Sequence, residues 1–215
     1  PGQSFQAWRL LKYLKSCMAD DGDILLESYL QGWDQLLEYA DTVTPFQGPP
    51  NRSRDLKESA LQISQAQIPV SSSGSSAYRS VQSMVRAELK AGVVNFYHRT
   101  DSGCRTLLRL HRSLLWLKLM LEGLSEGPDS ASNSAACLLR DAYMVALAPH
   151  HPWLLRQAAE VVFLALPDRQ YFLQLVCVQK QEEAAPVLRI IIHALTQVHT
   201  RTQQILEEHG MLELP

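Results

Sequence analysis

The sequence lacks the features that mark several large classes of protein. Its 215 residues carry a net charge of −2 and a pI near 6.4, so there is no general basic field to attract nucleic acid. No apolar run approaches the ~20 residues that a membrane-spanning helix needs. Cysteines are few and far apart, without the spacing of metal ligands, and each lies in an apolar, helix-like context. We therefore expect reduced thiols rather than disulfides at Cys17, Cys104, Cys137 and Cys177.

Catalytic signatures are missing as well. The chain contains no GxSxG, HExxH or CxxC motif and no glycine-rich phosphate loop. Its histidines are scattered except for the adjacent pair His150–His151, whose side chains cannot both face the same way. Three interpretations of this pair stay open: a metal site, a corner histidine bonded to the backbone, and a ligand-contacting histidine at a helix start. We expect a protein that is not an enzyme and that holds no metal or cofactor.

Almost every periodic stretch has the period of a helix, and none shows sustained alternation of period two. The sequence therefore predicts an all-α protein of about eight helices, with residues 1–215 forming one domain. Trp8, Trp33 and Trp116 are expected in the core, and Gly210 is expected to end the last helix. The expected helical ranges are 4–18, 24–43, 53–65, 77–98, 102–124, 131–148, from Pro152 to 166, 168–178 and 182–209.

Apolar stripes assign an inward face to two of these helices. In the helix over 77–98 the inward residues are Val81, Met84, Val85, Leu89, Val93, Val94 and Phe96. In the helix over 131–148 they are Cys137, Leu138, Tyr143, Met144 and Leu147. The proline- and glycine-rich stretch 44–52 and the stretch 66–76 are expected to be loops.

The most informative stretch is an apolar helix that carries two arginines one turn apart. Leucines fall on nearly every side of residues 101–121, which indicates an interior helix. Arg105 and Arg109 are i,i+4 neighbours on one face, and Arg112 follows three residues later. A buried guanidinium keeps its charge and needs an anionic partner. Either salt bridges to acids such as Asp101, Glu122 or Asp141 neutralise the pair, or a phosphate or carboxylate ligand does.

Six motifs spread over nearly the whole chain form a specific combination. They are YLQGW (29–33), YRSVQSMV (78–85), SGCRTLLRLHR (102–112), WLKLMLEGL (116–124), HPW (151–153) and EHGMLELP (208–215). Together they resemble the glycolipid transfer protein family, and most of all its branch that carries ceramide-1-phosphate. The resemblance implies a two-layer all-α sandwich that encloses a hydrophobic pocket for ceramide chains, with a polar headgroup site at its mouth.

The resemblance also assigns roles to individual residues. Arg105 and Arg109 would bind the lipid phosphate, and His151 would donate a hydrogen bond to the ceramide amide carbonyl. Asp55 would take the amide nitrogen and the hydroxyl, although by itself it reads as an ordinary first-turn acid of a helix. In the sugar-binding branch a tryptophan stands at the place of Arg109, and it stacks on the first sugar. Arginine at this position argues for phosphate over sugar.

One position departs from the pattern of the phosphate-binding branch. That branch has a lysine one turn after the aspartate, whereas this chain has Ser59. The nearest cation, Lys57, follows Asp55 by two residues and lies on a different helix face. Arg52 or Arg54 would compensate if the preceding loop folds inward.

The functional prediction is an intermembrane transfer protein that binds ceramide-1-phosphate in preference to glycosylceramide and changes no bond. Trp153 is predicted to dock on the membrane, although a tryptophan there is also typical of a core or interface aromatic. Met211 and Leu212 are predicted to form a lid or a pocket wall. We expect a cytoplasmic monomer that is peripheral at membranes, with no nucleic-acid partner. The alternative is a non-transferring lipid sensor or helical interaction module of the same fold.

Overall fold

The computed structural model describes residues 7–43, 77–126, 134–164, 166, 169–175 and 181–215. These residues form eight α-helices, one short 3₁₀ helix and no β-sheet, which confirms the predicted all-α class. The elements are α1 (Ala7–Ser16), α2 (Leu26–Val43), α4 (Val81–Ala91), α5 (Gly103–Ser125), α6 (Ala135–Ala146), η1 (Ala148–His150), α7 (Trp153–Leu164), α8 (Arg169–Leu175) and α9 (Gln181–Glu208). The helix expected over 53–65 lies outside the described residues.

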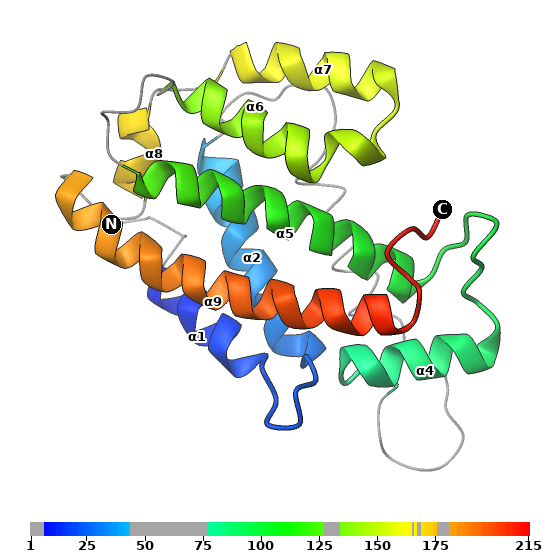
Figure 1. The fold of residues 1–215 in the computed structure, drawn as a ribbon. Helices are drawn as coiled ribbons and strands as arrows, with labels where there is room; N and C mark the ends of the chain where they lie inside the picture. Colours follow the sequence, from blue (N-terminus) through cyan, green and yellow to red (C-terminus); the bar gives the residue numbers. More distant parts are fainter. Residues whose placement is uncertain (1–6, 44–76, 127–133, 165, 167–168, 176–180) are drawn as a thin grey trace.

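The helices are arranged around α5 and α9. In Figure 1, α6, α5, α9 and α1 lie side by side in that order, and each contacts the next. Helix α7 packs on α6, while α2 passes behind this row and contacts α1 and α8. The chain ends beside the first turn of α5 (Figure 1). Among the described helices, α5 therefore has neighbours on several sides, whereas α7 has one main neighbour.

The core lies mainly along the seam between α5 and α9. Leu107, Leu110 and Leu114 of α5 are buried, as are Leu195 and Val198 of α9. Each fully buried leucine or valine contributes about 1.5–3 kcal/mol relative to an exposed one. The leucine-rich α5 is thus an interior helix, as its sequence predicts.

Helix α4 begins with a well-formed cap and ends seven residues earlier than predicted. Ser80 and Ser83 form a capping box at its start. At its end Gly92 adopts φ 69°, in the left-handed region, and its N–H is satisfied by the Glu88 and Leu89 carbonyls. The predicted continuation to residue 98 is wrong because this glycine turns the chain out of the helix.

The segment after α4 has an exposed apolar character that the sequence analysis did not predict. Phe96, predicted to face inward, is 44% exposed, and Val93 is exposed as well; Leu89, also predicted inward, is exposed within the last turn of α4. Val94, in contrast, packs against the core. Beyond Gly92 the helical period no longer applies, so spacing cannot assign these side chains to a face.

Two further assignments at helix surfaces need correction. Trp8, predicted in the core, is 61% exposed and lies against Arg9, whose guanidinium is 5.4 Å from the ring centroid. Met144, predicted on the inward stripe of α6, is also exposed, because no described helix covers that side of α6. Trp33 is buried as expected, and Trp116 is half-buried.

Two other expectations are confirmed. Gly210 has φ 65° and ends α9, and the next amide, that of Met211, donates to the Leu206 carbonyl. Cys17, Cys104 and Cys137 are free thiols. Cys177 lies outside the described residues.

Candidate functional site

A buried carboxylate fixes the N-terminal end of α5. Glu88 of α4 is 2% exposed, and its Oε1 accepts hydrogen bonds from the Gly103 N–H at 2.7 Å and the Tyr78 hydroxyl at 2.9 Å. Its Oε2 accepts from the Cys104 N–H at 2.9 Å. An anion at a helix N-terminus satisfies unpaired amides and interacts favourably with the helix dipole. Glu88 was not among the predicted site residues, although an acid on the apolar stripe Val81, Met84, Val85 is a signal for it.

The buried carboxylate also affects its neighbours. Burial and the nearby Glu88 charge raise the pKa of the Cys104 thiol and of the Tyr78 hydroxyl. Both groups therefore stay protonated, and the Tyr78 hydroxyl remains a donor to Glu88.

A side chain at the first position of α5 would displace the side chains that pack there from α4. A Cβ on Gly103 would lie 2.6 Å from Met84 Sδ and 2.9 Å from Glu88 Oε1. Ser102 precedes this glycine as the N-cap, and its hydroxyl accepts from the Arg105 N–H at 3.1 Å. The close approach of α4 and the cap together fix the backbone from which Arg105 extends.

The arginines of α5 form a cationic group at this end of the helix. Arg105 is half-buried, and burial, followed by the charges of Arg99 and Arg109, lowers the pKa of its guanidinium. Asp101 acts in the opposite direction but more weakly. Arg109 is exposed, so the expectation that both arginines lie in the interior is wrong for this residue. The leucines that suggested an interior helix are buried on its other faces.

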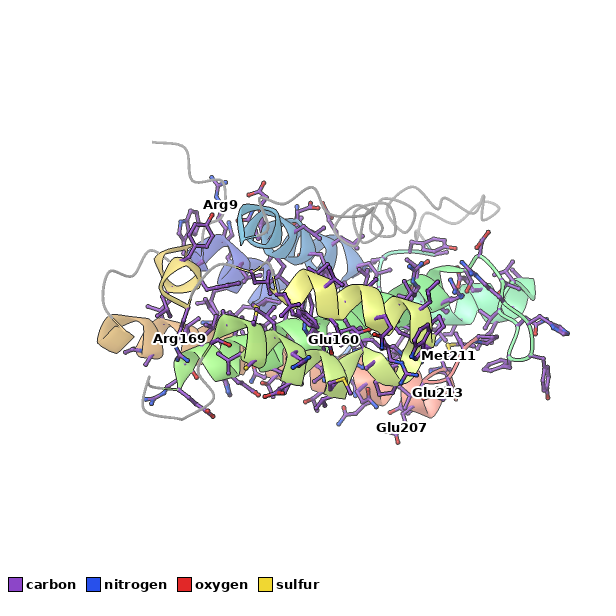
Figure 2. All side chains as sticks on the ribbon, turned by 90° about the horizontal axis from the view of Figure 1, so that it is seen from above. Arg9, Glu160, Arg169, Glu207, Met211 and Glu213 are labelled. Carbon is purple, nitrogen blue, oxygen red and sulfur yellow. The ribbon has the colours of Figure 1, made fainter. Side chains whose placement is uncertain are left out.

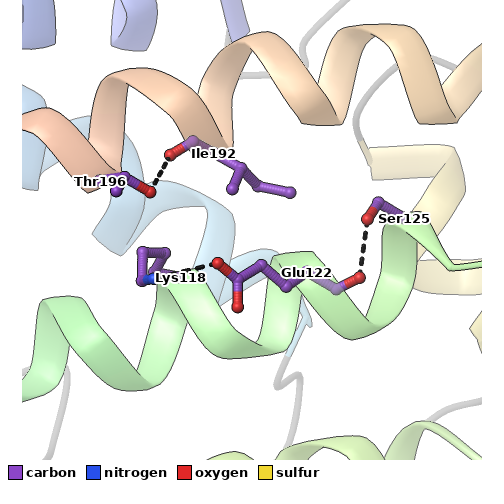
Figure 3. Close-up of polar contacts among 5 residues, drawn as sticks. All are labelled: Lys118, Glu122, Ser125, Ile192 and Thr196. Atoms are coloured by element: carbon purple, nitrogen blue, oxygen red, sulfur yellow. Dashed lines mark hydrogen bonds and ion pairs between the residues drawn. The ribbon is translucent and has the colours of Figure 1, made fainter.

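No aspartate or glutamate side chain forms an ion pair with Arg105 or Arg109 within the part of the chain that the structure describes. Ion pairs there join Arg112 to Glu213, Lys118 to Glu122, and Arg140 to Glu160. Glu122, considered above as a partner for the arginine pair, instead accepts a hydrogen bond from Lys118 at 3.0 Å, further along α5 (Figure 3). Of the two explanations for the arginine pair, salt bridging is therefore not realised among these residues.

The C-terminal segment, residues 211–215, lies against the arginines. Arg105 Nε donates to a terminal oxygen of Pro215, the last residue of the sequence, at 2.6 Å, and Arg112 Nη2 donates to the carbonyl oxygen of Leu212 at 2.7 Å. Glu213 is 3.7 Å from Arg112 but is largely exposed. Met211 is buried, and Figure 2 shows it with Glu213 at the end of the molecule where α9 finishes.

The corner between α6 and α7 places two histidines near this group. His151 follows η1 and is half-buried, and its Nδ1 lies 3.0 Å from the Tyr143 hydroxyl. Burial and the charge of Arg112 lower the pKa of His150, whereas Glu213 raises it, so His150 lies within electrostatic reach of both. No group of three potential metal ligands occurs among the described residues.

Trp153 begins a helix whose apolar side chains are exposed. It is 64% exposed, so the alternative of a plain core aromatic is wrong. Along α7 only Ala159 and Phe163 are buried. The exposed apolar residues of this helix are Trp153, Leu154, Leu155, Val161, Val162 and Leu164.

The remaining predicted site residues, Asp55 and Ser59, lie outside the described residues, as do Arg52, Arg54 and Lys57. Within the described helices, none combines the length and apolar character needed to cross a membrane. The fold and site thus define a helical protein with a cationic group at one end of a buried helix and an exposed apolar helix close by.

Comparisons with known proteins identify the family. The family described as "Glycolipid transfer protein (GLTP)" matches residues 24–178. A ceramide-1-phosphate transfer protein of Xenopus laevis is 37% identical over 218 residues, covering 99% of this chain and 98% of its own. The human ceramide-1-phosphate transfer protein is 36% identical over 215 residues, covering 96% of this chain and 94% of its own.

Solved structures agree with the sequence relatives. The apo form of mouse ceramide-1-phosphate transfer protein has a TM-score of 0.86 and 34% identity, covering 98% of this chain and 100% of the other. The human protein in complex with 12:0 ceramide-1-phosphate has a TM-score of 0.84 and 32% identity, covering 96% and 97%. The chain belongs to the glycolipid transfer protein family and has its all-α fold. Proteins of this family bind and transport lipids without catalysis, so the chain is not an enzyme.

Proposed function

We propose that this chain transfers ceramide-1-phosphate between membranes, with residues 1–215 acting as one domain. The observation that carries the proposal is the pair Arg105 and Arg109, which form no ion pair with an acidic side chain among the described residues. A guanidinium pair at i,i+4 spacing matches a phosphate, whose several oxygens accept from both groups at once. The relatives named for ceramide-1-phosphate transfer support the same headgroup.

The next polar contact with the lipid would come from His151, at the corner after α6. In the proposal His151 bonds the ceramide amide carbonyl, and the contact with the Tyr143 hydroxyl orients its ring. Asp55 takes the amide nitrogen and the hydroxyl, and Ser59 stands where related proteins have a lysine. These two assignments rest on the resemblance of the sequence.

Transfer also requires an apolar pocket for the lipid chains and a surface that binds the membrane. An apolar pocket would bury the acyl and sphingoid chains, at about 0.8 kcal/mol per methylene, which offsets their removal from the bilayer. Docking would use α7, because Trp153 and its exposed apolar neighbours present a surface that a bilayer interface can accept. That the chain is a cytoplasmic monomer and peripheral at membranes remains a prediction.

A vesicle assay tests the headgroup assignment. We expect transfer of fluorescent ceramide-1-phosphate and little transfer of glucosylceramide. Arg109→Leu should lower ceramide-1-phosphate transfer about ten- to a hundredfold, the value of one charge-assisted contact. Arg189→Leu, at an exposed arginine of α9, is the matched control and should transfer normally. Equal transfer of both lipids by the unmodified chain would contradict the proposal.

The alternative function is a non-transferring lipid sensor or helical interaction module of the same fold. Ser59 favours it, because a serine in place of a lysine leaves the phosphate with one cation fewer. Binding of ceramide-1-phosphate without transfer of either lipid would support this alternative.

A further inference from the structure

The turn between α6 and α7 brings the Tyr143 hydroxyl to the side of His151. Tyr143 lies in the last turn of α6 and is 0% exposed. The Leu147 N–H donates to the Tyr143 carbonyl at 3.0 Å, and the short helix η1, which contains Pro149, then leads to His151. The His151 N–H donates to the Ala148 carbonyl at 3.2 Å, which fixes the backbone of the histidine. Local hydrogen bonds therefore set the position of both side chains.

Neighbouring rings fix the orientation of the Tyr143 side chain. It packs edge-on against Phe163 of α7, with the ring centroids 5.5 Å apart and an angle of 63° between the planes. Phe163 is itself buried. The centroid of the His151 ring lies 5.7 Å from that of Tyr143. The Tyr143 hydroxyl is thus held 3.0 Å from His151 Nδ1, and the other ring nitrogen, Nε2, is left for a different contact.

The chemistry of the ligand decides which nitrogen of His151 must carry the proton. A neutral imidazole has one donor nitrogen and one acceptor nitrogen. The amide carbonyl of a ceramide only accepts hydrogen bonds, so the nitrogen that meets it must carry a hydrogen. Because Nδ1 faces Tyr143, that nitrogen is Nε2, and Nδ1 is left as the acceptor. A hydroxyl next to Nδ1 supplies the donor that this tautomer requires, as partners of a histidine ring commonly do.

We propose that Tyr143 is a positioning residue of the headgroup site: its hydroxyl donates to His151 Nδ1 and so keeps the proton on Nε2, where it meets the lipid amide carbonyl. The inference rests on the proposed function. With the proton on Nδ1, two acceptors would face each other, and the hydrogen bond to the lipid would be lost. The arginines would then select the phosphate, and Tyr143, acting through His151, would select the amide.

Nuclear magnetic resonance of the chain without lipid tests the tautomer. With isotope-labelled histidine, the shifts of the two ring nitrogens and their couplings to the ring protons distinguish the tautomers, and His151→Leu identifies the His151 signals. At neutral pH the unmodified chain should show His151 with the proton on Nε2. Tyr143→Phe should show a mixture of the two tautomers. A proton on Nδ1 in the unmodified chain, or an unchanged tautomer in Tyr143→Phe, would overturn the inference.

Calorimetric titration tests the effect on lipid binding. Tyr143→Phe should bind short-chain ceramide-1-phosphate and the matching ceramide roughly three- to tenfold more weakly, the value of one hydrogen bond. Dodecyl phosphate, which has a phosphate but no amide, should bind this variant as it binds the unmodified chain. In a His151→Leu background Tyr143→Phe should cause no further loss, because its hydroxyl acts through the imidazole.

Tyr29→Phe is the matched control. It removes the same hydroxyl from a buried tyrosine of α2, whose oxygen has no hydrogen-bond partner among the described residues, and it should bind all three lipids normally. Equal losses for dodecyl phosphate and ceramide-1-phosphate in Tyr143→Phe would assign Tyr143 a structural role only and overturn the inference. Thermal unfolding identifies a folding defect, in which case the tautomer in the unmodified chain decides. Failure of the unmodified chain to bind ceramide-1-phosphate would reject the proposed function instead.

Discussion

Helix α7 has the more apolar sequence of the two helices α5 and α7, yet α5 is the one that is buried. Helix α5 lies between α6 and α9 and buries Leu107, Leu110 and Leu114, although it also carries three arginines. Helix α7 packs mainly on α6 and leaves Trp153 and Leu154 in solvent. The number of packed neighbours, rather than apolar content, decides burial here.

Because of this difference, the two helices would have different roles in the proposed function. A helix that packs on several sides has a rigid backbone. The capped first turn of α5 fixes the position from which the arginine side chains extend. A helix packed on one side contributes little to the core and keeps an apolar surface available for a membrane. Recognition of the headgroup would depend on α5, and docking on α7.

The largest effect should come from truncating matched leucines in the two helices. Leu110→Ala removes a side chain that is 0% exposed, and it should lower the free energy of unfolding by about 2–5 kcal/mol. Leu154→Ala changes a side chain that is 72% exposed and should alter stability by no more than about 0.5 kcal/mol. Denaturant unfolding measures both. Similar losses for the two variants would mean that α7 is a core helix.

A smaller effect is expected when the exposed surface of α7 is reduced. Trp153→Ala should weaken binding to phospholipid vesicles about tenfold, since burying an aromatic side chain is worth about 1.5–3 kcal/mol. Its melting temperature should stay unchanged because the side chain is exposed. Sedimentation with vesicles measures the binding.

The matched control is Trp8→Ala, which removes a tryptophan of similar exposure, 61%, from α1. It should bind vesicles as the unmodified chain does. An equal loss in both variants would show that exposed tryptophans act non-specifically, and the assignment of docking to α7 would fail.

Much of the helical framework could be read from the sequence because helix periodicity and caps are local properties. The buried leucines of α5 and the cap at Gly210 were predicted on that basis. The early end of α4 was not, because Gly92 precedes residues that continue an apolar pattern. Trp8 was misplaced since periodicity shows which residues share a face but not whether another element covers it.

The candidate site could be predicted only in part. Arg105 and Arg109 lie one turn apart on α5, and the side chains of Arg105, Arg109 and His151 carry recognisable charge and motif signals. The backbone oxygens of Leu212 and Pro215, which accept from Arg112 and Arg105, had no such signal, because every residue carries a backbone oxygen. Their position depends on the path of the chain after α9, which no local pattern specifies.

The smallest effect should be a pH dependence that originates on the buried side of α5. His111 of α5 stacks on His199 of α9, with ring centroids 4.1 Å apart and an angle of 12° between the planes. His111 Nδ1 and His199 Nε2 are buried without a hydrogen-bond partner in the described part of the chain. Burial lowers the pKa of both rings, that of His199 to about 3. The hydrogen bond between His111 and Gln203 acts in the opposite direction but more weakly, whereas Arg112 lowers the pKa of His111, and His111 and Lys118 lower that of His199.

Both rings are therefore neutral in the folded protein and protonate near pH 6.5 in the unfolded chain. The contribution of the two neutral rings to the free energy of unfolding is fully present above about pH 6.5 and is lost as the pH falls from there toward 3.

Between pH 7.5 and pH 5.5 we expect Tm to drop by roughly 2–4 °C, which corresponds to about 1 kcal/mol after allowing for the partial exposure of His199. His199→Gln should reduce this drop, and His193→Gln, at an exposed position of the same helix, should not. Because α7 contains no histidine, its binding to neutral vesicles should change little over this range. A drop in Tm that persists unchanged in His199→Gln would place the acid sensitivity outside the α5–α9 seam.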